Sequence, residues 1–194
     1  ETLDQLFVDD TVDLVEEMPA NVVSRILQNT DAATRRQIND ILHYPRDSAG
    51  SVMTVEYVSL RRNMTVAQAF EQIRRVGVDK ETIYTCYVTE NRRLLGVVTA
   101  KELLISDPDR VVGDIMETNV IFVNTTDDKE FAAQQLQKYD LLALPVVDRE
   151  QRLVGIVTVD DAMDVLAEEN AEDMEMMAAI TPSDKPYLKT SVWE

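Results

Sequence analysis

The sequence predicts an α/β fold in which one small unit of strands and helices occurs twice, between a small all-α region and a long acidic helix. The heptapeptide Arg93–Thr99 (RLLGVVT) returns 59 residues later as Arg152–Thr158 (RLVGIVT), with five of seven positions identical. Only two copies occur, and a period near 60 residues is too long for a solenoid repeat. The repeat therefore indicates two small modules that pack together.

Residues 1–44 carry signals for helices only. Thr11 or the residue before it can cap a first helix that we expect to end near residue 18. Pro19 can open a second helix to about residue 29, and Asp31 can cap a third to about residue 42. One apolar stripe per helix makes a thin core, so we expect a small all-α domain. Tyr44-Pro45 then breaks the helical pattern and marks the boundary.

From residue 48 the pattern alternates between strand and helix, and the two copies agree element by element. In the first unit, residues 48–108, the expected strands cover 57–60, 83–89 and 94–99, and the expected helices cover 66–76 and 100–105. In the second unit, residues 109–166, the expected strands cover 120–123, 143–147 and 153–158. Thr126 or Asp127 is expected to cap the helix between the first two of these strands. A last helix, over residues 160–180, begins where the second unit ends.

The composition limits the chemistry. The chain has 194 residues, 45% of them hydrophobic, but no run approaches the about 18 apolar residues of a membrane helix, so we expect a soluble chain. The single Cys86 and single His43 exclude a Cys/His zinc cluster and argue against a Cys-His or Ser-His nucleophilic pair. No phosphate-cradling glycine loop is present either, so we expect no enzyme. The solitary cysteine also indicates a reducing, cytoplasmic compartment.

The net charge of −17 is concentrated at the two ends of the chain. Residues 1–24 hold seven acids and residues 153–184 hold nine, and neither segment contains a lysine or an arginine. Between them, residues 25–152 are nearly balanced, with 17 bases against 19 acids. This distribution argues against nucleic acid and anionic lipid as partners, and it favours cations or basic proteins.

Acids recur at helical spacing in the last helix. If residues 160–177 form one helix, five carboxylates three or four positions apart share a face: Asp161, Asp164, Glu168, Glu172 and Glu175. Like charges at this spacing cost about 0.2–0.5 kcal/mol per pair, and a hard cation removes that cost. Mg²⁺ prefers oxygen ligands and is usually held by one or two carboxylates. The pattern is equally typical of a solvated acidic face or a flexible linker.

The second unit resembles a CBS domain in the order of its elements. A strand and a helix precede Leu144–Asp148 (LPVVD), and a polar turn, Gly155–Thr158 (GIVT) and another helix follow. This order is typical of CBS domains, which occur as tandem pairs, and the resemblance covers about residues 50–166. It implies an α+β CBS pair of small mixed sheets and helices. Such pairs serve channels, transporters, kinase subunits and enzymes, so this resemblance alone implies fold rather than function.

The segments around the CBS pair indicate which kind of protein contains it. Tyr44–Thr54 (YPRDSAGSVMT), Lys80–Tyr84 (KETIY) and Val159–Leu166 (VDDAMDVL) are similar to the cytosolic part of an MgtE-type magnesium transporter. The resemblance implies that residues 1–44 are a helical N-domain without its front part and that residues 160–180 are a connecting, plug-type helix. Residues 181–194 would lead into a membrane domain outside this sequence. It also implies a homodimer at the cytoplasmic face of the plasma membrane, with the transporter's own transmembrane pore domain as partner.

The same resemblance implies which carboxylates bind Mg²⁺. Two lie in the helical domain, Asp9 and Asp13. The others lie in the second unit and the connecting helix: Asp128, Glu130, Asp140, Asp161, Asp164, Glu169, Glu172 and Asp173. Three of these have a simpler alternative, because Asp128 and Glu130 would complement a helix dipole and Asp140 would end the helix.

A second ligand, ATP, is implied by a motif of the CBS family. Clefts that bind adenosine phosphates resemble Gly-x-x-Thr-x-x-Asp, and Gly155, Thr158 and Asp161 match it. The first copy has Gly96 and Thr99 but ends in Glu, one methylene longer. With few bases near the motif, a Mg²⁺ complex of ATP suits it best. The alternative is that Gly-x-x-Thr merely ends a strand and caps a helix.

Two hypotheses of different classes follow. In the first, the chain senses intracellular Mg²⁺, and ions that bridge acidic surfaces close a pore. In the second, it is an adenine-nucleotide-sensing CBS module that regulates another protein. The first predicts a change in compactness with Mg²⁺ alone, and the second predicts nucleotide binding with little response to Mg²⁺ alone.

Overall fold

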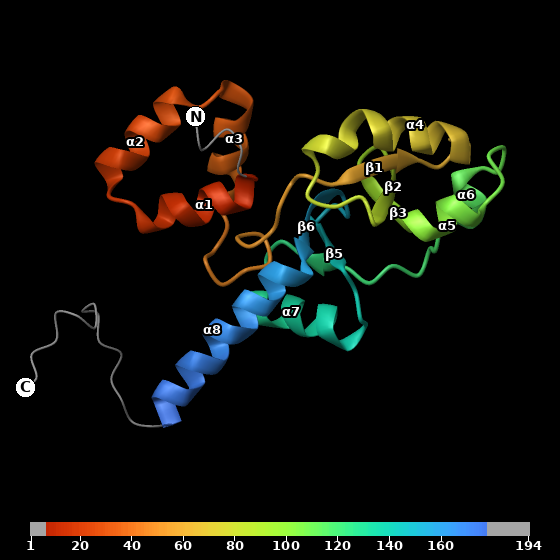
Figure 1. Ribbon diagram of the computed structural model, residues 1–194. Helices are drawn as coiled ribbons and strands as arrows, with labels where there is room; N and C mark the ends of the chain where they lie inside the picture. The colour runs from red at the N-terminus through yellow and green to blue at the C-terminus, as the bar shows by residue number, and fades with distance from the viewer. Residues whose placement is uncertain (1–6, 178–194) are drawn as a thin grey trace, which may run out of the picture.

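Three short helices open the described part of the chain and lie apart from the sheets (Figure 1). The computed structural model describes residues 7–177, and these helices are α1 (Val8–Glu17), α2 (Ala20–Asn29) and α3 (Ala32–Ile41). The apolar stripes of α1 and α3 face each other, with Val12 and Ile38 buried. The helices therefore share a small core, as their amphipathic patterns predict.

The predicted start is confirmed for α2 and α3 and wrong for α1. Pro19 precedes α2, and the Asp31 carboxylate accepts hydrogen bonds from the backbone N–H groups of Ala33 (2.8 Å) and Thr34 (3.1 Å). The N-cap of α1 is Phe7, and Thr11 lies inside the helix. Its hydroxyl donates to the Phe7 carbonyl at 2.9 Å, so Thr11 bonds back along the helix instead of capping it.

Each repeat forms a three-stranded sheet with the same order and the same directions. The strands are β1 (Val58–Arg61), β2 (Thr85–Glu90) and β3 (Arg93–Thr99) in the first, and β4 (Val123–Asn124), β5 (Ala143–Val147) and β6 (Leu153–Thr158) in the second. In both sheets the first two strands are parallel and the last two are antiparallel. The duplication in sequence is thus a duplication of structure.

Helices flank both sheets, and the longest one leaves the second sheet. They are α4 (Val66–Val76), the short 3₁₀ turn η2 (Gly77–Asp79), α5 (Ala100–Ile105), α6 (Val112–Ile115), α7 (Lys129–Lys138) and α8 (Val159–Met177). Thr65 caps α4 in a capping box with Gln68, at the predicted position. α8 begins directly after β6, packs on α7 and extends beyond the sheets (Figure 1).

Two predicted elements of the second repeat differ in the structure. Its first strand covers Val123–Asn124 rather than residues 120–123, and Asp128, not Thr126 or Asp127, caps α7. The Asp127 carboxylate instead accepts a hydrogen bond from the Asn124 backbone N–H at 2.7 Å. This turn uses Asp127 ahead of the helix and leaves the cap to the next residue.

The two repeats are interleaved through two crossing segments, Ser51–Thr54 before β1 and Asp114–Glu117 before β4. Thr54 pairs with Ile156 of β6 through reciprocal backbone hydrogen bonds of 2.8 and 2.9 Å. Glu117 pairs with Val97 of β3 in the same way, with both bonds at 2.9 Å. Each repeat therefore borrows a short edge from the chain that leads into the other repeat.

Two buried regions join the parts. Between the sheets, Tyr87 packs edge-on against Tyr57, with ring centroids 5.8 Å apart, beside the fully buried Ile156. A larger cluster joins the N-terminal helices to the second repeat and includes Val8, Val12, Ile38, Ile41, Ala132, Leu136, Leu144 and Val157. The helical domain and the second repeat thus share one core.

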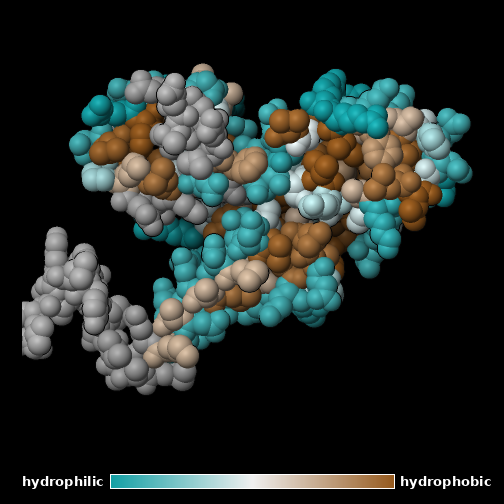
Figure 2. Space-filling view, in the orientation of Figure 1, coloured by the Kyte–Doolittle hydropathy of each residue, from teal (hydrophilic) through white to brown (hydrophobic). Residues whose placement is uncertain are grey.

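The surface differs between α4 and α8. Figure 2 shows hydrophilic residues over α4 and a mixture of hydrophilic and hydrophobic residues along α8. On α8, Ala162 and Val165 are buried, whereas Met163 and Met174 are exposed. None of the helices in the described residues combines the length and the apolar character that a membrane crossing requires.

Candidate functional site

The Gly-x-x-Thr-x-x-Asp motif lies at the junction of β6 and α8. The Thr158 hydroxyl donates a short hydrogen bond to the Asp161 carboxylate one turn later. In the first copy, the backbone N–H and hydroxyl of Thr99 donate to Glu102 at 2.7 and 2.9 Å, which completes a capping box. Both copies thus tie the threonine to the acid three residues on.

The glycine of the motif has a structural role in both copies. A Cβ on Gly155 would lie 2.6 Å from Met53 Sδ and 2.7 Å from the Thr54 carbonyl oxygen. A Cβ on Gly96 would lie 2.7 Å from the Glu117 carbonyl oxygen. Contacts this short exclude a side chain, so the crossing segments require glycine at both positions.

Acidic groups surround Asp161 on the side of the first repeat. Burial raises the pKa of Glu81 to about 7, and the charges of Asp160, Asp161, Asp10 and Glu56 act in the same direction. Within the described residues, the buried Oε2 of Glu81 has no hydrogen-bond partner. The approach to the motif therefore has a strongly negative potential, which favours a cation.

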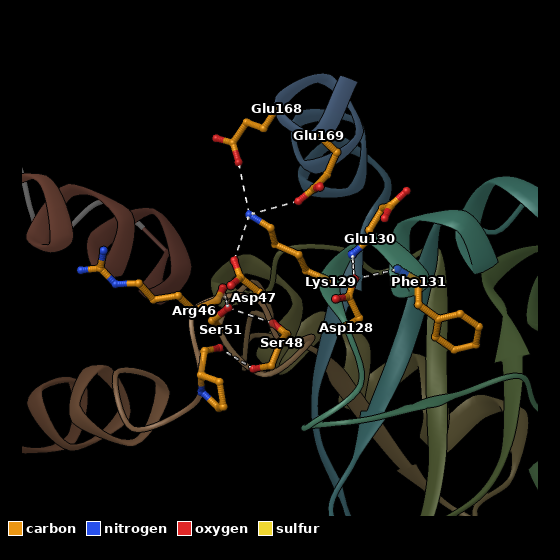
Figure 3. A network of polar contacts seen from close by, with 11 residues as sticks. Arg46, Asp47, Ser48, Ser51, Asp128, Lys129, Glu130, Phe131, Glu168 and Glu169 are labelled. Atoms are coloured by element: carbon orange, nitrogen blue, oxygen red, sulfur yellow. Dashed lines mark hydrogen bonds and ion pairs between the residues drawn. The ribbon is translucent and has the colours of Figure 1, made fainter. Parts of the chain in front are cut away.

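Lys129 connects α7, α8 and the linker that follows α3 (Figure 3). Its Nζ lies 3.5 Å from Glu168 Oε2 and 3.9 Å from both Glu169 Oε1 and Asp47 Oδ1. The lysine side chain is only 16% exposed. A single base thus neutralises part of the acidic face of α8.

Four of the predicted Mg²⁺ ligands form one acidic neighbourhood between the start of α7 and the middle of α8. The pKa of Glu169 is raised by burial first, and then by the charges of Glu172, Glu130 and Asp128, against the opposing effect of Lys129. Four carboxylates share this neighbourhood with one lysine, so Lys129 offsets only part of their charge. We call Asp128, Glu130, Glu169 and Glu172 the α7–α8 acidic surface.

Some oxygens of this surface already have partners. Asp128 Oδ1 accepts hydrogen bonds from the backbone N–H groups of Glu130 (2.8 Å) and Phe131 (3.3 Å), so Asp128 caps α7. Glu130 Oε1 accepts a hydrogen bond from Gln134 at 2.8 Å. Asp128 thus has a structural role as the cap of α7, and its second carboxylate oxygen lies outside these bonds.

Two further predicted ligands, Asp161 and Asp164, line a cavity of about 360 Å³ between the N-terminal helices and α8. Glu168 and Lys129 share this wall, and Val12 and Tyr44 belong to the opposite side. The cavity thus places carboxylates of α8 directly at the boundary with the helical domain.

The remaining predicted ligands are Asp140, Asp173, Asp9 and Asp13. Asp140 follows α7 with a positive φ of 51° and is exposed, and Asp173 is exposed on α8. Asp9 and Asp13 belong to α1, but their side chains fall outside the described part of the structure. Among the described residues, no three His, Cys, Asp or Glu side chains converge as a ready metal cage. The acids form surfaces rather than a chelating site.

Comparisons with known proteins place these features in one family. The CBS domain model matches residues 49–108 and 112–168, and the model of the MgtE intracellular N domain matches residues 1–47. A crystal structure of the cytosolic domain of the Mg²⁺ channel MgtE in complex with ATP is 42% identical, with a TM-score of 0.81. The match covers 84% of this chain and 67% of that one. The chain belongs to the MgtE family.

Curated relatives carry the same name. The magnesium transporter MgtE of Thermus thermophilus is 42% identical over 164 residues, which cover 84% of this chain and 36% of the relative. MgtE of Bacillus subtilis is 37% identical over 185 residues, or 93% of this chain and 41% of the relative. This MgtE chain thus spans about two fifths of its curated relatives. It contains the MgtE N domain and tandem CBS domains, as the family resemblance implied.

Sequence reasoning missed two residues of this MgtE site, Lys129 and Glu81. Lys129 occupies the first turn of α7, where the helix dipole disfavours a cation. A base at that position was a usable signal that acids from elsewhere in the chain surround it. Glu81 had no comparable signal, because its burial and its orphan oxygen depend on tertiary packing.

Proposed function

We propose that this chain is the cytosolic Mg²⁺-sensing region of a magnesium transporter. It would lie at the cytoplasmic face of the plasma membrane as a homodimer, joined to its own transmembrane pore domain. The observation that carries the proposal is the α7–α8 acidic surface, where Lys129 offsets only part of the charge. Membership of the MgtE family supports the assignment to magnesium.

Mg²⁺ would act by bridging surfaces that otherwise repel. The ion retains several waters and is usually held by one or two carboxylates, which suits acids spread over α7, α8 and the N-terminal helices. With the ion scarce, the helical domain would separate from α8 at the cavity lined by Asp161 and Asp164. With the ion abundant, closure would pass along α8 to the pore.

The required energy favours many weak sites. A shift from 1:99 to 99:1 takes about 5.5 kcal/mol of differential binding. One ion at about three times its dissociation constant contributes only about 0.8 kcal/mol. Roughly seven such sites are therefore needed, and a homodimer doubles the number that each chain supplies. The ten carboxylates proposed here are sufficient in number for this mechanism.

Small-angle scattering and limited proteolysis of the chain, with and without Mg²⁺, test the proposal. We expect a smaller radius of gyration and slower cleavage in the helical domain as Mg²⁺ rises through the millimolar range. The double substitution Glu169→Gln and Glu172→Gln should shift the transition to higher Mg²⁺. The control is Glu71→Gln, at an exposed position of α4, which removes one charge far from the acidic surface. It should leave the Mg²⁺ concentration at the midpoint of the transition unchanged. No compaction up to tens of millimolar Mg²⁺ would refute the proposal.

A second proposal is that the Gly-x-x-Thr-x-x-Asp motif with Thr158 and Asp161 is part of a binding site for ATP, without catalysis. The MgtE cytosolic domain that is similar to this chain is described in complex with ATP, and the motif residues match. The negative potential around Asp161 and Glu81 favours the Mg²⁺ complex over free ATP. Calorimetry should detect binding that Asp161→Ala or Thr158→Val abolishes, with no release of phosphate. ATP binding that survives both substitutions would exclude this motif as the ATP site.

A further inference from the structure

The first repeat contains a cavity of opposite chemistry to the acidic surface. It has a volume of about 860 Å³ and lies at the end of β1, beside α4, α6 and the β2–β3 turn. Four arginines line it, Arg61, Arg62, Arg75 and Arg92, against two acids, Glu90 and Asp114. The cavity lies at the start of β3, and Thr99 lies at its end. A strand of this length spans about 20 Å, which separates the cavity from the Gly-x-x-Thr motif.

Arg62 is held in place by a close contact with glycine. A Cβ on Gly113 would lie 2.6 Å from Arg62 Cγ and 3.2 Å from Arg62 Nε, so the arginine side chain crosses the bare backbone. The Gly113 N–H also donates to the Arg62 carbonyl at 2.9 Å. The guanidinium is thereby positioned before any ligand arrives.

Two more arginines are positioned by local structure. Arg75 donates a short hydrogen bond to Gln72 one turn earlier on α4, and both residues line the cavity. Asn91 and Arg92 form the β2–β3 turn, and both have a positive φ, 51° at Asn91 and 68° at Arg92. A left-handed backbone conformation is unfavourable for arginine, and glycine is the usual residue at this position of a two-residue hairpin.

The second repeat provides an internal comparison, because the strand pairings align the two copies. Its counterparts of the four arginines are Asn124, Thr125, Lys138 and Gln151. Gln151 has the same positive φ, 62°, and its carbonyl accepts the same cross-repeat hydrogen bond as that of Arg92. The backbone roles are therefore shared by both copies, and the arginine side chains are not. The fold does not require them.

The charge of the cavity also lacks an internal explanation. Within residues 7–177, none of the four guanidinium groups forms an ion pair, in a chain whose net charge is −17. The four arginines are exposed at the rim of the cavity, and like charges gathered around one concave site give it a positive potential that favours an anion. Guanidinium forks bind phosphate oxygens in pairs, which makes phosphate the matching anion.

We propose that this cavity binds a phosphorylated small molecule that carries at least two phosphate groups. The four arginines provide two guanidinium groups for each of two phosphates, and the net charge of +2 that remains after Glu90 and Asp114 are offset neutralises part of the phosphate charge. Ser59 and Thr89 add hydroxyl groups to the lining. A volume of about 860 Å³ is in the range of small-molecule sites. The site is separate from the Mg²⁺ and ATP sites proposed above and uses none of their residues.

Calorimetry of the whole chain with inorganic pyrophosphate tests the proposal. The buffer must be free of divalent cations, because pyrophosphate chelates Mg²⁺. We expect binding with a dissociation constant below about 1 mM, and weaker binding of inorganic phosphate. Arg62→Gln and Arg75→Gln should each weaken pyrophosphate binding at least tenfold, since each removes a charged hydrogen-bond donor. Using two variants guards against loss of packing, because Arg62 also lies over Gly113.

Arg74→Gln is the matched control. Arg74 is on the same helix and loses the same charge, but it lies over the Phe70 ring and outside the cavity lining. It should change the affinity less than twofold, and Asp161→Asn should leave pyrophosphate binding intact. No binding at about 10 mM pyrophosphate, or equal weakening by Arg74→Gln, overturns the proposal. Loss of binding in Asp161→Asn would instead assign the anion to the CBS cleft and also overturn it.

Discussion

Replacing Lys129 by methionine tests whether this lysine and Mg²⁺ act on the same carboxylates. Methionine keeps the apolar stem, which is largely buried, and removes the charge that lies 3.5 Å from Glu168 and 3.9 Å from Glu169 and Asp47. Unit charges at such distances attract by about 1 kcal/mol in water. Because Glu168 and Asp47 are well exposed, each pair contributes about 0.2–1 kcal/mol after screening.

The expected loss in metal-free buffer is therefore about 1–2 kcal/mol of unfolding free energy, or about 3–6 °C in Tm for a chain of this size. Thermal unfolding with and without about 20 mM Mg²⁺ measures it. If Mg²⁺ binds the acids that Lys129 now offsets, the ion should restore at least half of the loss in the variant. Lys138→Met, on the far end of α7 over the Tyr139 ring, should lose less than about 1 kcal/mol and show no added response to Mg²⁺. An equal loss with and without Mg²⁺ would refute the reasoning.

Three further predictions concern single groups. The pKa of Glu81, raised by burial to about 7 from 4.5, means that the folded chain binds this proton more tightly than the unfolded chain. Stability should therefore fall as pH rises from about 4.5 to about 7, by about 1 kcal/mol after screening, and an unchanged pH slope in Glu81→Gln would contradict this. Tyr87→Phe removes a buried hydroxyl that has no partner among the described residues, so urea denaturation should show no loss. Tyr57→Phe, which breaks a 3.2 Å bond to the Leu153 carbonyl, should lose about 0.5–1.5 kcal/mol, and equal losses in both would count against this reading. Gly155→Ala should lower Tm by an amount equivalent to about 1–3 kcal/mol, mainly through the 2.7 Å contact of the new Cβ with the Thr54 carbonyl oxygen, and an unchanged Tm would exclude that contact. Gly77→Ala is the control, because a Cβ on Gly77 would meet only side-chain methyl groups, those of Ile83 at 3.0 Å and Ile73 at 3.7 Å.

The fold could be predicted from sequence where one local rule decides. Asp31 and Thr65 cap helices at the predicted positions because each stands directly before two apolar residues with which the helical pattern begins. At α7 three candidate caps stand together, and residue type alone cannot rank them, because Asp127 is used by the turn at Asn124. Thr11 failed as a cap because a hydroxyl can also bond back to the turn before it.

The acidic surface could be predicted only in part. Helical spacing was enough to group the acids of α8, because side chains three and four positions apart share a face. Their approach to Asp128 and Glu130 depends on how α7 packs on α8, which periodicity cannot show, and the family resemblance implied only that these residues bind Mg²⁺. Lys129 and Glu81 depend on contacts between segments about 40 and about 80 residues apart, so neither was identified from spacing.

The crossing segments have a consequence for the order of folding. Pairing Thr54 with Ile156 closes a loop of about 100 residues, whereas each hairpin of β2–β3 or β5–β6 closes within a few residues. The hairpins are therefore expected to form early, the Glu117–Val97 pair next, because it closes about 20 residues, and the Thr54–Ile156 pair last. The two repeats therefore differ in when their borrowed edges become available during synthesis. The first repeat gains its edge once residue 117 has left the ribosome, whereas residues 51–54 have no partner at this edge until β6 has been made.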